Sequence, residues 1–210
     1  MTKKQASHIV DSLESIYPDA VCSLEYEEPW QLLIAVRLSA QCTDARVNIV
    51  TKCLFEKFPT LQSLADAPIE EIAEIIKPCG LFKIKAQNIK ETCRILCCDF
   101  GGVLPDNMEA LLTLPGVGRK TANLILGDIY GVPAVVCDTH CIRITNRLGM
   151  INVIDPHKAE LSLQELLPPE RSNDFCHRLV LFGREYCTAR YPKCTKCPLA
   201  PICPSENTPR

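Results

Sequence analysis

The stretch LPGVGRKTAN at residues 114–123 decides the fold that we expect for this chain. Residues 108–112 before it are typical of a short helix, and apolar residues recur at helical spacing over residues 121–130 after it. Pro115 and two glycines indicate a tight turn, so the stretch predicts a helix-hairpin-helix motif. Because glycine lacks a Cβ atom, the backbone N–H groups of such a turn can approach a phosphate oxygen. A turn that only joins two packed helices is the alternative interpretation.

Lys120 follows this turn directly and is the first candidate catalytic residue. The helix dipole disfavours an ammonium group in the first turn of a helix, and partial burial would disfavour it further. Both effects would favour the neutral amine that a nucleophile needs. A solvated contact with phosphate, which we expect of Arg119, is the simpler role for such a lysine.

Asp138 is the second candidate, eighteen positions after Lys120. It precedes residues 139–143 and fits the N-cap of a helix, a structural role that needs no chemistry. A helix from Lys120 to Tyr130 covers about 15 Å at about 1.5 Å per residue. The chain from Tyr130 to Asp138 can then span up to about 26 Å when it is extended. The segment from Tyr130 to Asp138 is therefore long enough to bring Asp138 back to Lys120, but its length alone does not require this.

The composition is that of a soluble globular protein with one large or two small domains. The 210 residues are 47% hydrophobic and 23% charged, with a net charge of −2 and a pI near 6.1. Most DNA-binding proteins are basic, so a phosphate-binding face in this chain must be a local patch. The basic residues of two candidate patches are Lys77, Lys83, Lys85, Lys90 and Arg94, and Arg119, Lys120, Arg143 and Arg147.

Helical patterns extend over most of the chain. We expect helices at residues 3–17, 30–40, 45–58, 83–98, 108–112, 121–130, 139–148, 156–166 and 171–186, with a further helix that begins near Pro68. Residues 77–82 are expected to form a turn. Because no sustained two-residue alternation occurs, the predicted fold class is all-α. The N-terminus has no apolar signal core and no run reaches membrane-spanning length, so we expect a cytoplasmic chain with reduced thiols.

Four of the fourteen cysteines form an array near the C-terminus, Cys187-x6-Cys194-x2-Cys197-x5-Cys203. Four thiolates from one loop suit a 4Fe-4S cluster or a tetrahedral zinc ion. Structural zinc sites commonly have two close pairs, whereas this array has one close pair between wide gaps, which favours the larger cluster. The segment is rich in proline and poor in apolar residues, so metal binding would supply free energy for its folding. The other ten cysteines are expected to be unligated.

LPGVGRKTAN at 114–123, VVCDTHCIRITNRLG at 135–149 and the cysteine array together resemble the endonuclease III family of base-excision DNA glycosylases. The resemblance extends over nearly the whole chain. It implies a two-lobed helix-hairpin-helix glycosylase fold with a 4Fe-4S cluster in the loop 187–203. The domains that it implies are a six-helix bundle at residues 22–132 and a discontinuous helical domain of residues 1–21 and 133–210.

The resemblance also implies the reaction and its catalytic residues. Lys120 would attack the sugar C1′ of a damaged nucleotide, with Asp138 as its catalytic partner in the cleft between the two domains. The function implied is that of a bifunctional DNA glycosylase and abasic-site lyase of base excision repair. It would act as a monomer on double-stranded DNA that contains oxidised pyrimidines or abasic sites. A mismatch-specific glycosylase on the same scaffold and a non-catalytic DNA-binding module are the alternatives.

By the same resemblance, Gln41 and Leu81 are wedges that fill the gap left by an extruded nucleotide. Extrusion is needed because C1′ is shielded inside a duplex, and unstacking costs a few kcal/mol. Ordinary packing at a helix end is the alternative for both residues. Further DNA contacts are implied at Gly116, Val117, Gly118, Arg119 and Lys193, with Asp44 and His140 as weaker candidates for the pocket lining. Tyr191 departs from the family pattern, in which a basic residue is expected at this loop position.

Overall fold

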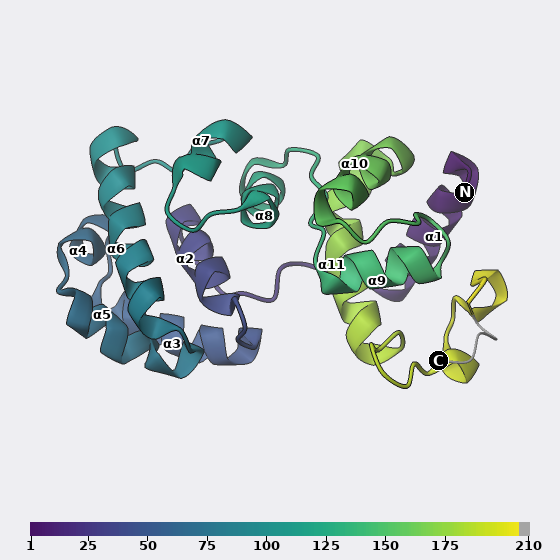
Figure 1. Ribbon diagram of the computed structural model, residues 1–210, viewed down its shortest axis with the longest axis horizontal. Helices are drawn as coiled ribbons and strands as arrows, with labels where there is room; N and C mark the ends of the chain where they lie inside the picture. The colour runs from purple at the N-terminus through teal and green to yellow at the C-terminus, as the bar shows by residue number, and fades with distance from the viewer. Residues whose placement is uncertain (206–210) are drawn as a thin grey trace. The chain divides into compact units, whose positions relative to one another are not determined.

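The computed structural model describes residues 1–205 and is built from helices (Figure 1). The chain divides into two compact units. Unit 1 comprises Met1–Cys22 and Gly131–Arg210, and unit 2 comprises Ser23–Tyr130. No β-strand occurs within residues 1–205, which confirms the predicted all-α class. Among the same residues, no helix is long and apolar enough to cross a membrane.

Unit 2 is organised around a buried helix. Its helices are α2 (Pro29–Ser39), α3 (Asp44–Lys57), α4 (Leu61–Asp66), α5 (Ile69–Ile76), the 3-10 helix η1 (Lys77–Cys79), α6 (Phe82–Asp99), α7 (Met108–Thr113) and α8 (Arg119–Tyr130). Helix α2 packs against α3 and α8, and Leu32, Leu33 and Ile34 on it are fully buried. Helices α4 and α5 pack against α6, as Figure 1 shows. The nearly continuous apolar sequence of α2 follows from its contacts on several sides.

Helix α4 is the one α-helix of unit 2 that the sequence pattern did not indicate. With it, the described residues of unit 2 form seven α-helices, one more than the six expected. Thr60 Oγ1 accepts a hydrogen bond from Ser63 N at 3.1 Å, and Ser63 Oγ accepts one from Thr60 N at 3.1 Å. This pair is a capping box in which serine replaces the usual glutamate or glutamine, so its signal in the sequence is weak.

Unit 1 is organised around its last α-helix. Its helices are α1 (Lys3–Ile16), α9 (Thr139–Arg147), α10 (Pro156–Leu166), η2 (Pro169–Arg171), α11 (Ser172–Glu185), η3 (Cys194–Lys196) and η4 (Ala200–Ile202). Helix α11 packs against α1 and α9, and its Phe175 and Phe182 are fully buried. A Cβ atom on Gly183 would overlap His140 Nδ1 and would lie 2.9 Å from Ile144 Cδ1. Glycine at 183 therefore permits the close packing of α9 on α11.

Candidate active site and cysteine loop

The hairpin between α7 and α8 is held from inside unit 2 by two side chains. Gly116 has φ +70°, and Arg37 Nη1 from α2 donates a hydrogen bond to its carbonyl oxygen. Thr92 Oγ1 from α6 donates to Pro115 O at 3.5 Å. Burial lowers the pKa of the Arg37 guanidinium. Because these carbonyl groups are bound within the unit, the N–H groups at the start of α8 are the polar groups that the hairpin can offer to an anion.

Val117 anchors the turn of the hairpin. Its side chain is buried, and its N–H donates to Leu114 O at 3.0 Å. Gly118 lies in open space, since nothing would lie within 4 Å of a Cβ atom there. Arg119 is half-buried at the first position of α8. These contacts confirm a tight turn at the predicted position, in which Val117 has a structural part.

Lys120 is the second residue of α8 and its side chain is exposed. Its predicted position in the first helical turn is therefore confirmed, and its side chain lacks the partial burial that the sequence left open. Ala122, Ile125 and Leu126 of the same helix are buried where α8 packs against α2. This apolar face fixes the helix and leaves the Lys120 amine in water.

Asp138 is the N-cap of α9, as the sequence predicts. Its Oδ1 accepts a hydrogen bond from Cys141 N at 2.7 Å, and its side chain is half-buried. The residues before it, from Ala134 to Cys137, are buried, and Val136 N donates to Cys176 Sγ at 3.2 Å. The chain that leads to Asp138 is therefore fixed in unit 1 on both sides. Its pairing with Lys120 stays a prediction of the family resemblance.

The two weaker candidates have structural partners. His140 Nδ1 lies 3.1 Å from Arg143 Nη2 on the same helix. Asp44, at the start of α3, accepts a hydrogen bond from Ser23 Oγ at 2.6 Å. Both contacts are sufficient to explain these residue types, so neither side chain needs a role in a pocket.

Gln41 and Leu81 share an unusual backbone conformation. Their φ angles are +59° and +49°, in the left-handed region that favours glycine. A non-glycine residue pays about 1–2 kcal/mol there. The Gln41 side chain is exposed, and 61% of Leu81 is accessible to solvent. Each turn therefore presents a side chain to water at an energetic cost. Neither residue 41 nor residue 81 is itself the glycine that would reveal this conformation in the sequence.

Four of the five residues of the first candidate basic patch bind acceptors within unit 2. Lys85 is buried, with 3% of its surface accessible. Lys90 Nζ donates to Ala67 O at 2.6 Å. The remaining pairs are the salt bridges Arg94–Glu91 at 2.7 Å and Lys77–Glu74 at 3.3 Å. The fifth residue, Lys83, is exposed on α6.

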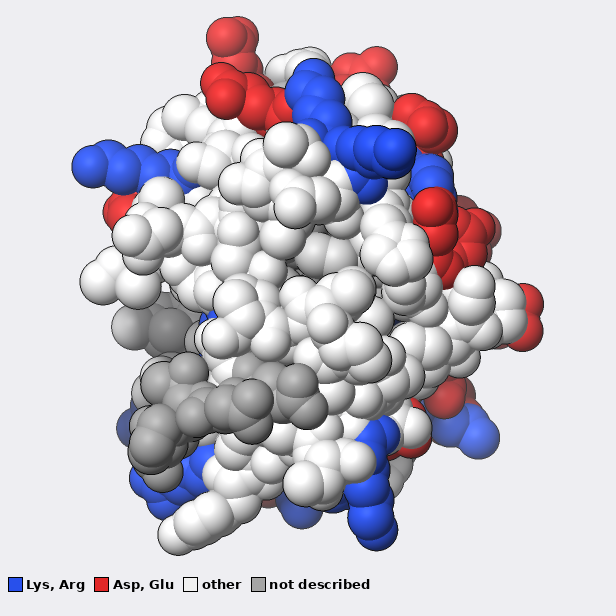
Figure 2. All heavy atoms as spheres, turned by 90° about the vertical axis from the view of Figure 1, so that its right-hand side faces the viewer, with Lys and Arg blue, Asp and Glu red and all other residues white. Residues whose placement is uncertain are grey.

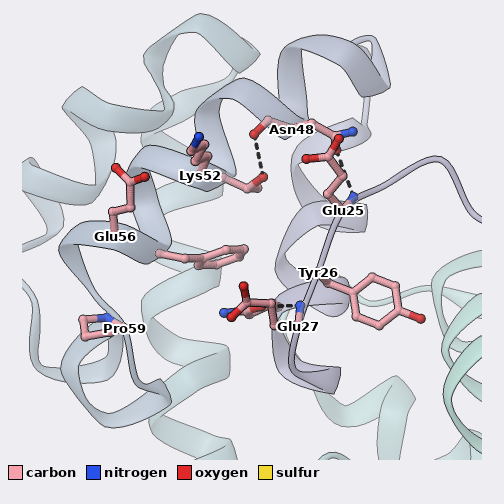
Figure 3. Close-up of a pocket in the computed structure, with 10 residues that line it drawn as sticks. Glu25, Tyr26, Glu27, Asn48, Lys52, Glu56 and Pro59 are labelled. Atoms are coloured by element: carbon pink, nitrogen blue, oxygen red, sulfur yellow. Dashed lines mark hydrogen bonds between the residues drawn. The ribbon is translucent and has the colours of Figure 1, made fainter.

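A hollow of about 460 Å³ on unit 2 lies among residues of α2 and α3 and the segment before α2 (Figure 3). Glu25, Glu27 and Glu56 line it together with Lys52 and the Phe55 ring. The backbone N–H of Glu25 donates to an amide oxygen from α3, and that of Glu27 to one from α2. With three carboxylates and one ammonium, this hollow repels phosphate, so we exclude this face from DNA binding.

The four cysteines of the array line one small hollow in unit 1. Its other lining residues are Arg147, Leu148, Phe182, Tyr186 and Pro192. None of the four thiols is in a disulfide bond, and all four cysteines are half-buried. Arg147 Nη1 lies 3.3 Å from Cys187 Sγ, so a cation faces the thiol set. Four thiols around a hollow with apolar walls and an arginine fit a cluster that thiolates make net negative. Within residues 1–205, no three His, Cys, Asp or Glu side chains are placed to share one metal ion.

Two arginines join α9 to the loop 187–203, here called the cysteine loop. Arg143 Nη2 donates to Cys187 O at 3.0 Å, and Arg147 Nη1 donates to Thr188 O at 2.8 Å. Burial lowers the pKa of Arg143. Both arginines were expected in the second phosphate-binding patch. Their guanidinium groups bind carbonyl groups of the cysteine loop, so that expectation is wrong for these two residues.

The cysteine loop exposes Lys193 and Tyr191. Lys193 precedes η3, and its backbone N–H donates to Tyr186 O at 2.9 Å. Tyr191 has φ +55° and is 92% accessible. On the face drawn in Figure 2, basic and acidic side chains both lie around the edge and the centre carries neither. Charge on this face is therefore mixed and forms no field of one sign.

The comparisons with known proteins agree with this geometry. A family profile described as HhH-GPD superfamily base excision DNA repair protein matches residues 34–169. The endonuclease III of Synechocystis sp. is 46% identical over 206 residues, which are 98% of this chain and 94% of that protein. This chain belongs to the endonuclease III family. A solved structure of a trapped endonuclease III–DNA covalent intermediate matches with a TM-score of 0.92 and 42% identity, over 98% of this chain and 97% of that chain.

As a member of the endonuclease III family, the chain is a bifunctional DNA glycosylase and abasic-site lyase of base excision repair. Membership sets aside the alternative of a non-catalytic DNA-binding module. A thermostable thymine-DNA glycosylase has the same fold, with a TM-score of 0.85 and 27% identity over 97% of both chains. Because this identity is lower than that of the endonuclease III relative, the comparison favours the endonuclease III activity over mismatch repair.

Proposed function

We propose that the chain removes oxidised pyrimidines from double-stranded DNA as a monomer, with Lys120 as the nucleophile. The observation that carries this proposal is the place of Lys120, an exposed amine at the start of α8 directly after the hairpin. Hairpin N–H groups that bind a phosphate would hold the sugar next to this amine. A related endonuclease III was trapped in a covalent intermediate with DNA, which supports covalent catalysis here.

The reaction proceeds by substitution and then elimination. The Lys120 nitrogen forms a bond with C1′, and the base leaves with the electrons of the glycosidic bond and takes up a proton. Opening of the sugar ring at the C1′–O4′ bond gives a Schiff base. Removal of a proton from C2′ then expels the 3′ phosphate by β-elimination, and the strand is cut 3′ to the lesion. Water releases Lys120 by hydrolysis of the imine.

Asp138 is proposed as the catalytic partner of Lys120. Its carboxylate would stabilise positive charge at the sugar as the base departs and would help to move protons. The half-buried position and the N-cap bond support this role, because they fix the carboxylate before DNA binds. A preorganised charge needs no reorganisation when the transition state forms.

Five further contacts with DNA belong to the proposal. Gln41 and Leu81 would enter the duplex as wedges, since both are exposed on turns of unit 2. Gly116 and Gly118 would present the backbone of the hairpin to a phosphate. Lys193 would contact a phosphate from the cysteine loop, where its side chain is exposed.

We also propose that Cys187, Cys194, Cys197 and Cys203 hold a 4Fe-4S cluster. The common hollow that they line and the facing Arg147 support this ligand set. The bound cluster would supply cross-links among four parts of a loop that has few apolar residues of its own. Arg143 and Arg147 would transmit this order to α9, because they bind the carbonyl groups of the loop.

Borohydride trapping on abasic-site DNA tests Lys120. The native protein should give a covalent adduct, and Lys120→Gln should give none. Lys158→Gln, which removes an exposed amine from α10 in unit 1, is the matched control and should form the adduct at the native rate. Mass spectrometry of the reduced adduct should locate the sugar on residue 120. An adduct on another lysine would contradict the assignment.

A panel of lesion duplexes tests the substrate class. Duplexes with a ring-saturated or ring-opened oxidised pyrimidine should be cut, and matched duplexes with a thymine–guanine mismatch should not be. Removal of mismatched thymine at a comparable rate would support the alternative of a mismatch-specific glycosylase.

A further inference from the structure

Lys85 on α6 is a buried ammonium group with three neutral partners. Its Nζ donates to Leu38 O at 3.0 Å, Ala40 O at 2.8 Å and Cys79 O at 2.9 Å. An ammonium group has three donors, so these bonds satisfy all of them. Burying a cation is costly, and burial lowers the pKa of Lys85. The three hydrogen bonds offset part of this cost and fix the backbone at the three acceptor residues.

The three carbonyl groups belong to two turns that are far apart in sequence. Leu38 and Ala40 lie at the C-terminal end of α2, where carbonyl groups lack partners within the helix. Cys79 is the last residue of η1. One side chain from α6 therefore ties the end of α2 to the end of η1, both within unit 2.

Each of these turns leads directly to a proposed wedge. Gln41 follows Ala40, and Leu81 lies two residues after Cys79. Lys85 also contacts Leu81 directly, because its backbone N–H donates to Leu81 O at 3.1 Å. Both wedge residues have left-handed backbones, which persist only where the surrounding structure fixes them. Lys85 therefore contacts both of these turns.

We propose that Lys85 is a positioning residue for nucleotide extrusion, which holds the turns of Gln41 and Leu81 together so that both side chains enter the duplex as one unit. This inference rests on the proposed roles of Gln41 and Leu81. Two wedges must fill one gap at the same time, so a change in the distance between their turns would let only one of them insert. Lys85 itself touches neither DNA nor the reacting atoms.

A purely structural lysine would affect all activities equally, whereas a positioning lysine would affect extrusion alone. An abasic sugar in single-stranded DNA is already unstacked and needs no wedge. The informative quantity is therefore the ratio of base excision from a lesion duplex to lyase activity on single-stranded abasic DNA. A 2-aminopurine base next to the lesion reports unstacking directly by its fluorescence.

Lys85→Met removes the donors and keeps an unbranched apolar side chain that extends as far as Cε. We expect kcat/KM for excision from the duplex to fall at least tenfold and the 2-aminopurine signal on binding to be lost. Lyase activity on single-stranded abasic DNA should stay within about threefold of native. The matched control is Lys90→Met, because Lys90 is on the same helix and binds a single carbonyl oxygen, that of Ala67. It should leave the ratio of the two activities unchanged.

An equal loss of both activities in Lys85→Met would overturn the inference and leave the role of Lys120 intact. Absence of a borohydride adduct in the native protein on single-stranded abasic DNA would instead overturn the proposed nucleophile. If Lys85→Met does not fold, a second test uses Gln41→Ala, Leu81→Ala and the double variant in the native background. It asks whether the two wedges enter the duplex as one unit. Wedges held as one unit predict a double variant no worse than the poorer single variant, and multiplied losses would contradict this.

Discussion

Arg37 fills the space in which a side chain on Gly116 would lie, and its Nη1 donates to the Gly116 carbonyl oxygen. The hairpin thus depends on glycine for two reasons, its positive φ and this close approach. Gly116→Ala should cost about 1–2 kcal/mol from the backbone alone and lower the melting temperature by roughly 2–8 °C. It should also weaken binding to undamaged duplex DNA, because Arg37 must move.

Gly118→Ala is the control for this substitution, since its Cβ atom would meet nothing within 4 Å. Thermal unfolding and fluorescence anisotropy with a labelled duplex provide the two measurements. Equal effects of the two alanine variants would contradict both the backbone cost at Gly116 and the importance of its contact with Arg37.

Two substitutions of Asp138 separate its role as a helix N-cap from the proposed role of its negative charge in catalysis. Asparagine caps a helix as well as aspartate does, so Asp138→Asn should keep the native melting temperature. If the charge acts in the reaction, kcat for base excision should fall by about 100-fold or more. Asp138→Ala should show this loss and lose about 1 kcal/mol of stability in addition. Native kcat in Asp138→Asn would leave Asp138 with the structural role alone.

The proposed cluster predicts the iron content of the purified protein. The native chain should contain iron and acid-labile sulfide in equal amounts, close to four of each per chain. Cys194→Ser should lose most of both and should be cut more rapidly by protease within the cysteine loop. Cys53→Ser, which changes an exposed thiol on α3 of unit 2, should keep the native content. A native preparation with one zinc ion per chain and no iron would refute the cluster.

Stability at alkaline pH should depend on Cys79. Burial, aided by the neighbouring Cys42, raises the pKa of the Cys79 thiol to about 11, and Lys85 opposes this shift. Between about pH 9 and pH 11 the unfolded chain loses this proton while the folded chain keeps it. The free energy of unfolding should therefore fall in that window, by up to about 1.4 kcal/mol per pH unit from this thiol.

Urea unfolding at pH 8 and pH 10 measures this effect. The decrease between the two pH values should be smaller in Cys79→Ala than in the native protein. Cys53→Ala, with an exposed thiol, should show the native decrease. An unchanged decrease in Cys79→Ala would mean that the thiol ionises without cost to the fold.

Local signals in the sequence were sufficient for most helices and for the cap at Asp138. Apolar periodicity and breaking residues placed the ends of the α-helices within about two residues. Among the α-helices of residues 1–205, only α4 was missed, because Ser63 gives a weak capping signal. The contacts of Lys85 could not be predicted in this way. Its acceptors are 45 and 47 residues before it and six residues before it, and only the packing of α6 on α2 brings them together.

Charge patterns were the least reliable guide to the site. The sequence does not distinguish a lysine or arginine that faces water from one whose side chain binds a carbonyl group. Arg143 and Arg147 follow a helical spacing that suits a surface, yet each binds the backbone of the cysteine loop. The family motif was the better guide because it fixes residue types in order, and Lys120 lies in the first turn of α8, which begins at Arg119.

The packing of α9 on α11 places unequal demands on its two sides. At Gly183 there is room for a hydrogen atom and nothing larger, whereas the facing His140 could be shortened without a clash. Where these two helices cross, substitutions should therefore be tolerated at residue 140 on α9 and rejected at residue 183 on α11. Active clones from a randomised library would keep residue 183 almost invariant and accept several smaller replacements at residue 140.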